Sequence, residues 1–100
     1  MMGRKIREFP ENERPRERLM KQGVSSLSDA ELLAIILRTG TSKENVLEMS
    51  RELLDKFNLK DLSRANIARL EKTCGIGEAK ACQIVACFEL GRRLAVIGQN

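Results

Sequence analysis

Apolar residues recur every three or four positions along most of this chain, which is the spacing of one face of an α-helix. Over residues 43–57 a single stripe is formed by Val46, Leu47, Ser50, Leu53, Leu54 and Phe57. No segment alternates apolar and polar residues over several positions, as a half-buried β-strand would. The pattern predicts an all-α fold, a compact bundle of about five helices.

Residues that favour helix ends divide this pattern into separate helices. Pro15 suits the first position of a helix, and Gly23 suits the position just after a helix end. We therefore expect a charged first helix between them, with Leu19 and Met20 as its apolar contacts. Because it carries so few apolar residues, this helix should lie on the surface of the domain.

A second helix has the clearest start in the sequence. Ser28 and Glu31 have the spacing of a capping box, in which each side chain accepts a hydrogen bond from the backbone of the other residue. The apolar run 32–37 follows, and Gly40 comes soon after it, which favours a helix over a buried strand. We interpret this segment as the central buried helix.

The C-terminal part predicts a short helical turn and two further helices. The turn is expected at 59–62, and Asn66 is a suitable N-cap for a helix that ends by Thr73. The last helix is predicted from Glu78 to about Ala95. Apolar residues surround much of its circumference, so we expect it to be largely buried.

The pattern also predicts how the chain is organised into domains. Residues 1–13 are polar and aperiodic, and we expect a flexible arm there. The remaining pattern, over 14–97, fits a single helical domain, because a chain of 100 residues buries only one modest core.

Composition narrows the class of protein. The chain is 42% apolar and 32% charged, as soluble globular proteins are, and its longest apolar run is too short to span a bilayer. The basic N-terminus is not followed by the apolar segment of a secretory signal. We therefore expect a cytoplasmic protein that does not contact a membrane.

The three cysteines, Cys74, Cys82 and Cys87, do not have the spacing of a zinc site, and the chain has no histidine. We expect them to be reduced thiols buried as small apolar residues, and we expect no metal and no cofactor.

The net charge of +4 indicates a polyanionic partner only weakly, because a small surplus is usually a solvated face. The charge is unevenly distributed, since residues 27–63 are acidic and both ends of the chain are basic. Residues 64–100 hold six Lys and Arg against three Asp and Glu.

The segment 70–84 carries the most informative chemistry. Gly75 and Gly77 flank Ile76 between two predicted helices, and Lys80 follows in the first turn of the second helix. Glycines allow torsions closed to other residues and leave no Cβ in front of an approaching phosphate. Ile76 should point inward, while the amides and the positive dipole end of the second helix face the anion. We expect the backbone amides of all three turn residues and the ammonium group of Lys80 to bind a DNA phosphate.

Two interpretations of this turn are open. Glycine-containing turns commonly join two packed helices without any ligand. The whole pattern over about 66–94, with apolar Leu70, Ala81 and Ile84, resembles the helix-hairpin-helix motif and favours phosphate binding. Cys74 departs from this motif, which often has proline at that position.

Binding should not depend on base sequence. No helix is dense in Arg, Asn and Gln, and the chain has no Trp or Tyr on which bases could stack. A single lysine contacts few phosphates, so affinity should be weak and sensitive to salt, unless Arg69 and Lys72 add contacts.

Four motifs that cover nearly the whole chain resemble the N-terminal region of the bacterial RadC family, described as DNA repair proteins. The motifs are Glu13-Arg14-Pro15-Arg16-Glu17-Arg18-Leu19, Leu27-Ser28-Asp29-Ala30-Glu31-Leu32-Leu33-Ala34, Leu37-Arg38-Thr39-Gly40-Thr41, and Gly75-Ile76-Gly77 followed by Glu89-Leu90-Gly91-Arg92-Arg93-Leu94. The resemblance implies a fold of the SAM or helix-hairpin-helix type and a DNA-binding module. It also implies a JAB/MPN-type domain with a zinc-binding motif, C-terminal to this region in full-length members.

The zinc chemistry of that domain does not carry over to this chain, which has no histidine and stops before it. We interpret the chain as an excised domain or a truncated member, and we expect no enzyme activity and no catalytic residue. The alternative function belongs to a different class, a protein-interaction or self-association module. It would use helix 78–95 or the charged face of helix 15–22, and its hairpin would be only structural.

Overall fold

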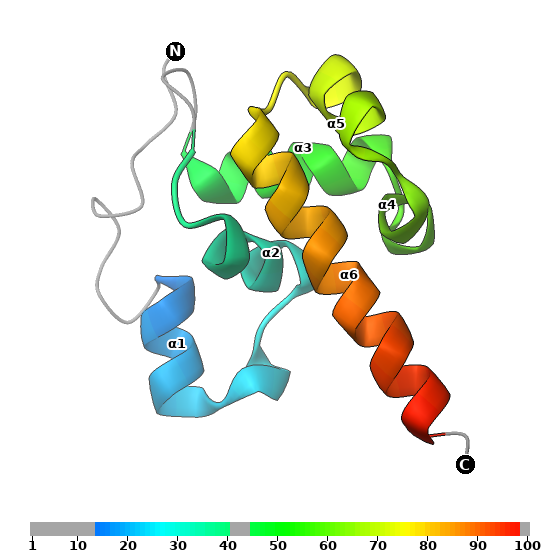
Figure 1. Ribbon diagram of the computed structural model, residues 1–100. Helices are drawn as coiled ribbons and strands as arrows, with labels where there is room; N and C mark the ends of the chain where they lie inside the picture. Colours follow the sequence, from blue (N-terminus) through cyan, green and yellow to red (C-terminus); the bar gives the residue numbers. More distant parts are fainter. Residues whose placement is uncertain (1–13, 41–44, 99–100) are drawn as a thin grey trace. The chain divides into compact units, whose positions relative to one another are not determined.

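The computed structural model describes residues 14–40 and 45–98, and all regular structure in these ranges is helical (Figure 1). The elements are α1 (Pro15–Gln22), the 3₁₀ turn η3 (Val24–Ser26), α2 (Asp29–Leu37), α3 (Val46–Lys56), α4 (Leu59–Arg64), α5 (Ile67–Cys74) and α6 (Glu78–Gly98). This confirms the all-α prediction, with the expected turn at 59–62 present as the helix α4. The predicted arm at 1–13 lies outside the described residues. No described helix is long and apolar enough to cross a membrane.

The chain divides into two compact units between Lys56 and Phe57. Unit 1 contains α1, η3, α2 and α3, and unit 2 contains α4, α5 and α6. The single domain expected over 14–97 stays a prediction.

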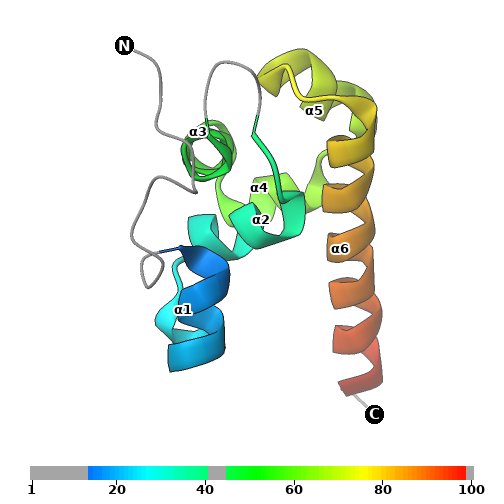
Figure 2. The same cartoon turned by 90° about the vertical axis from the view of Figure 1, so that its left-hand side faces the viewer.

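The core of unit 1 is the contact between α2 and α3. Its buried apolar side chains, each at most 7% exposed, are Leu33, Ala34, Leu37, Val46, Leu47, Met49 and Leu53. Ser50 is also fully buried, and its hydroxyl donates to the Val46 carbonyl at 2.8 Å, which removes the cost of burying a polar group. Figure 2 views α3 along its axis and α2 from the side, so the two helices cross. The prediction of α2 as a buried helix is confirmed.

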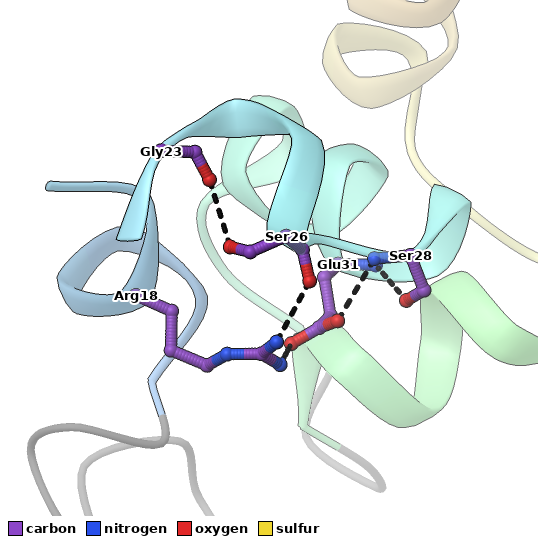
Figure 3. A network of polar contacts seen from close by, with 5 residues as sticks. All are labelled: Arg18, Gly23, Ser26, Ser28 and Glu31. Carbon is purple, nitrogen blue, oxygen red and sulfur yellow. Dashed lines mark hydrogen bonds and ion pairs between the residues drawn. The ribbon is translucent and has the colours of Figure 1, made fainter. Parts of the chain in front are cut away.

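The capping box at the start of α2 is confirmed and has an additional partner (Figure 3). The Ser28 hydroxyl accepts from the Glu31 amide at 3.2 Å, and the Ser28 amide donates to the Glu31 carboxylate at 2.9 Å. Arg18 of α1 forms an ion pair with the other oxygen of this carboxylate and donates to the Ser26 carbonyl at 2.8 Å. Glu31 is therefore part of the capping box that starts α2, and its ion pair with Arg18 holds α1 against α2.

Three helices of unit 1 differ in detail from their predictions. Gly23 follows α1 as expected, but Met20 is 72% exposed and is not an apolar contact of this helix. The residue with positive φ after α2 is Arg38 and not Gly40. Asn45 caps α3, because its side chain accepts from the Glu48 amide at 2.8 Å, so α3 begins at Val46 and not at about residue 43.

Unit 2 is built around the packing of α4 and α5 on the first half of α6. Its buried apolar side chains are Phe57, Leu62, Ala65, Leu70, Ile76, Ala81 and Ile84. Arg92 donates to the Ser63 carbonyl at 2.7 Å and so attaches α6 to the end of α4.

The prediction that α6 is largely buried is wrong, because only Ala81 and Ile84 are buried and every described residue from Leu90 onward is exposed. Leu90, Leu94 and Ile97 are about two thirds exposed, at 68%, 68% and 67%. Cys82 and Cys87 are free thiols, as expected, but both are exposed instead of buried. An apolar circumference predicts burial only where the helix has neighbours on all sides, and α6 extends beyond the helices that pack on it.

We predict that Glu31→Gln lowers the free energy of unfolding at pH 7 by about 0.5–1 kcal/mol, because glutamine can still accept the hydrogen bond from the Ser28 amide but loses the ion pair with Arg18. Burial alone would raise the pKa of Glu31, but its hydrogen bonds with Ser28 and the charge of Arg18 outweigh burial and lower it. Because the pKa is lower in the folded state, this stabilisation exists above the ordinary value of 4.5 and is lost as the pH falls through the folded value.

Urea denaturation from pH 7 down to pH 3 measures this effect. The wild-type chain should lose more stability over this interval than Glu31→Gln does. Glu52→Gln, at an exposed position of α3, is the matched control and should follow the wild-type profile. Equal pH profiles of stability for wild type and Glu31→Gln would contradict the lowered pKa of Glu31 in the folded state.

Candidate nucleic-acid interface

The turn between α5 and α6 consists of three residues, Gly75 to Gly77. Asn66 caps α5 as predicted, since its side chain accepts from the Arg69 amide at 2.8 Å. Gly75 ends α5 in the left-handed conformation, with φ 65° and ψ 21°, and its amide donates to the Glu71 carbonyl at 3.0 Å. The helix therefore extends to Cys74, one residue beyond the predicted end.

Ile76 fixes the turn to the core of unit 2. Its side chain is 4% exposed, and Leu70, Ala81 and Ile84 of the same core are at most 1% exposed. The inward orientation expected of Ile76 is confirmed. Because the middle residue of the turn is buried, Gly75 and Gly77 on either side of it are held at the surface.

The two glycines differ in what they contribute. Gly75 has a positive φ, which costs a residue with a Cβ about 1–2 kcal/mol. Gly77 does not have a positive φ, and a Cβ built on it would meet no described atom within 4 Å. We expected both glycines to have backbone torsions that other residues rarely adopt, and this is confirmed for Gly75 only. At Gly77 the absence of a side chain leaves the start of α6 open to solvent.

The start of α6 presents backbone amides on an exposed surface. The first hydrogen bond within the helix runs from the Ala81 amide to the Gly77 carbonyl at 3.1 Å. The amides of Glu78 and Ala79 precede this bond, and both residues are exposed. We call the surface formed by Gly75, Gly77, Glu78 and Ala79 the turn face. The Gly75 amide donates to the Glu71 carbonyl, so the prediction that it binds a phosphate is wrong. The amides of Gly77, Glu78 and Ala79 and the positive end of the α6 dipole are suited to an anion.

The three basic residues expected near this turn have different environments. Lys72 is exposed on the last turn of α5. The Arg69 guanidinium lies over the Phe57 ring, 5.2 Å from its centroid, which is a cation–π contact that limits its freedom. Lys80 is half-buried, so its side chain is only partly in solvent. Of the three, Lys72 has the environment best suited to meeting a polyanion.

The charge around the turn is mixed. Glu71 and Glu78 are exposed beside the basic residues and oppose an anion at close range. Unit 2 as a whole holds seven Lys and Arg against four Asp and Glu, so most of the net charge of the chain belongs to it. Backbone amides, and not a dense basic patch, are therefore the main feature of this surface.

Sequence reasoning missed the Arg69–Phe57 contact. No fixed spacing along the chain predicts it, because Phe57 precedes α4 and Arg69 lies on α5. It depends on how α4 and α5 meet in three dimensions.

Comparison with known proteins identifies relatives of the whole region. The UPF0758 N-terminal family matches residues 6–82. A UPF0758 protein of Methanosarcina barkeri is 54% identical over 90 residues, which are 90% of this chain and 39% of that protein. A UPF0758 protein of Bacillus licheniformis is 55% identical over 91 residues, 90% of this chain and 41% of that protein. The chain thus spans about two fifths of the length of these relatives. No solved structure matches it.

The geometry predicts different effects on the free energy of unfolding for two substitutions in the turn. Gly75→Ala should lower the free energy of unfolding by about 1–2 kcal/mol, because alanine is strained at its φ. Gly77→Asp should leave stability unchanged or raise it by a few tenths of a kcal/mol, since aspartate is a better N-cap than glycine and complements the helix dipole. Urea denaturation of both variants is the measurement, and a loss of stability in Gly77→Asp as large as that in Gly75→Ala would contradict the geometry.

Proposed function

The chain belongs to the UPF0758 family, whose matched region is the RadC N-terminal region, and we propose that it binds DNA through the sugar–phosphate backbone without reading base sequence. It acts as the N-terminal module of a longer, RadC-like protein associated with DNA repair. The module is not itself catalytic. The remaining part of the full-length protein holds the JAB/MPN-type domain and any chemistry that belongs to it.

The single observation that carries this proposal is the open surface at Gly77. Neither its torsion nor its packing requires glycine, yet glycine occupies the N-cap position of α6, where a Ser, Thr, Asp or Asn side chain would bond to the first amides of the helix. With glycine at this position, no capping side chain competes with a phosphate oxygen for these N–H groups.

The proposed contacts follow from the exposure of each group. The amides of Ile76 and Gly77 and those that begin α6 receive the phosphate, whereas the Gly75 amide already donates to the Glu71 carbonyl. Lys72 provides the long-range attraction, while Arg69 and Lys80 contribute within their existing contacts. Glu78 reduces affinity, so binding by one module is weak, and the salt dependence corresponds to few phosphate contacts.

A second function, interaction with another copy of the chain, is favoured by the exposed half of α6. Leu90, Leu94 and Ile97 recur at helical spacing and form a stripe on the side opposite the buried Ala81 and Ile84. We call this surface the α6 stripe.

The edge of the α6 stripe is self-complementary in charge. Glu89 and Arg93 lie along the same edge, where they form an ion pair at 2.9 Å within the chain. In an antiparallel pair of α6 helices, Glu89 of one copy lies opposite Arg93 of the other, so unlike charges meet across the two-fold axis. A second copy of the chain is therefore the partner that fits this surface.

If the turn face binds DNA, Gly77→Asp should weaken DNA binding without lowering the stability of the fold. The added carboxylate occupies the phosphate position and repels it, so affinity for a short duplex at low salt should fall at least about tenfold. Fluorescence anisotropy with a labelled duplex measures this effect. Asn58→Asp is the matched control, because it makes the same charge change at the N-cap of α4 in the same unit.

The Asn58→Asp control should bind the DNA duplex like the wild type. Lys72→Ala should reduce the slope of log affinity against log salt by about 1, whereas Lys60→Ala, at another exposed lysine of unit 2, should not. Unchanged affinity in Gly77→Asp would contradict the proposed function.

Self-association predicts a dimer whose fraction rises with protein concentration. Leu94→Lys should make the chain monomeric, because it places a charge in the centre of the α6 stripe. Sedimentation equilibrium measures the mass, with Met20→Lys on α1 as a control at an equally exposed apolar residue. A wild-type chain that is monomeric at every concentration tested would exclude this second function.

A further inference from the structure

Unit 1 contains a cavity of about 290 Å³ that the proposed function does not use. Its lining brings together two of the sequence motifs, Arg14-Pro15-Arg16-Glu17 at the start of α1 and Arg38-Thr39 after α2. These residues are more than twenty positions apart in the chain. The packing of α1 on α2 is what places them around one space.

We propose that this cavity binds a phosphate monoester carried by a compact organic group. Three arginines, Arg14, Arg16 and Arg38, line it against a single acidic residue, Glu17. Guanidinium is the side-chain group best matched to phosphate, because its planar set of N–H donors binds two oxygens at once. Thr39 is a further polar residue of the lining.

The size and the apolar lining define the rest of the ligand. Ala34, Ile35 and Val46 form an apolar wall next to the arginines. The volume is at the lower end of the range of about 300–1,000 Å³ that is typical of small-molecule sites. One phosphate and a group the size of a sugar or a single nucleoside fit these limits. The ligand is therefore a small organic phosphate or the phosphorylated end of a nucleic acid.

Arg38 provides an independent observation, because its backbone is strained. Its φ is 70° and its ψ is −49°, and the Thr39 amide donates to the Leu37 carbonyl at 2.8 Å across it. This is a γ-turn of the rare kind, which glycine adopts far more easily than arginine does. Arginine in this conformation lowers the stability of the fold. Backbone strain of this type clusters at functional sites, where it holds a side chain in the position that its function requires. Arg38 points to a functional requirement for its guanidinium.

Two variants test the proposal on the whole 100-residue chain. Arg38→Gly removes the guanidinium and relieves the strain, so it should raise the melting temperature while weakening ligand binding at least about tenfold. Arg16→Ala, at an exposed position, should weaken binding without changing the melting temperature. Arg51→Ala, an exposed arginine of α3 outside the cavity, is the matched control and should bind like the wild type.

The probes are adenosine 5′-monophosphate, adenosine, and one trinucleotide with either a 5′-phosphate or a 5′-hydroxyl, each titrated by NMR. The proposal requires that a phosphate-bearing probe binds at least about tenfold more tightly than its partner without phosphate. Tighter binding of the monophosphate than of the phosphorylated trinucleotide identifies a free small molecule, and the reverse order identifies a nucleic-acid end. Equal binding with and without phosphate, or full affinity in both Arg38→Gly and Arg16→Ala, would overturn the proposal.

Discussion

The burial of Ile76 is the constraint on which the hairpin of unit 2 depends. Its side chain is enclosed where α5 meets α6, and this fixes the path of the backbone through the residues on either side of it. Gly75 must take a left-handed conformation to end α5, and Gly77 must begin α6 at the surface. A single buried side chain therefore determines both the direction of α6 and the exposure of its first amides.

The two phosphate sites that we propose differ in chemistry. In unit 2 the donors would be backbone amides at a helix start, which are fixed by the fold and cannot be removed by changing one side chain. In unit 1 they would be the side chains of the arginines that line a cavity, which offer more hydrogen bonds but depend on side-chain position. The first arrangement suits a repeating backbone such as DNA, and the second suits a single phosphate with a defined group attached to it.

Local signals in the sequence predicted local structure well. The caps at Ser28 and Asn66 depend on residues within four positions of one another, and both are confirmed, while α5 ends one residue beyond its predicted end. Features that depend on tertiary packing could not be predicted in this way. The half-burial of Lys80 and the exposure of Leu90 and Leu94 are examples, because each depends on where the neighbouring helices end.

The central claim is that phosphate meets the start of α6, and backbone NMR with a short duplex tests it most directly. Titration at low salt should shift the amide signals of Gly75, Gly77, Glu78 and Ala79 first, and raising the salt concentration should reverse these shifts. Shifts confined to Leu90, Leu94 and Ile97, or no shift at the turn face, would contradict the account.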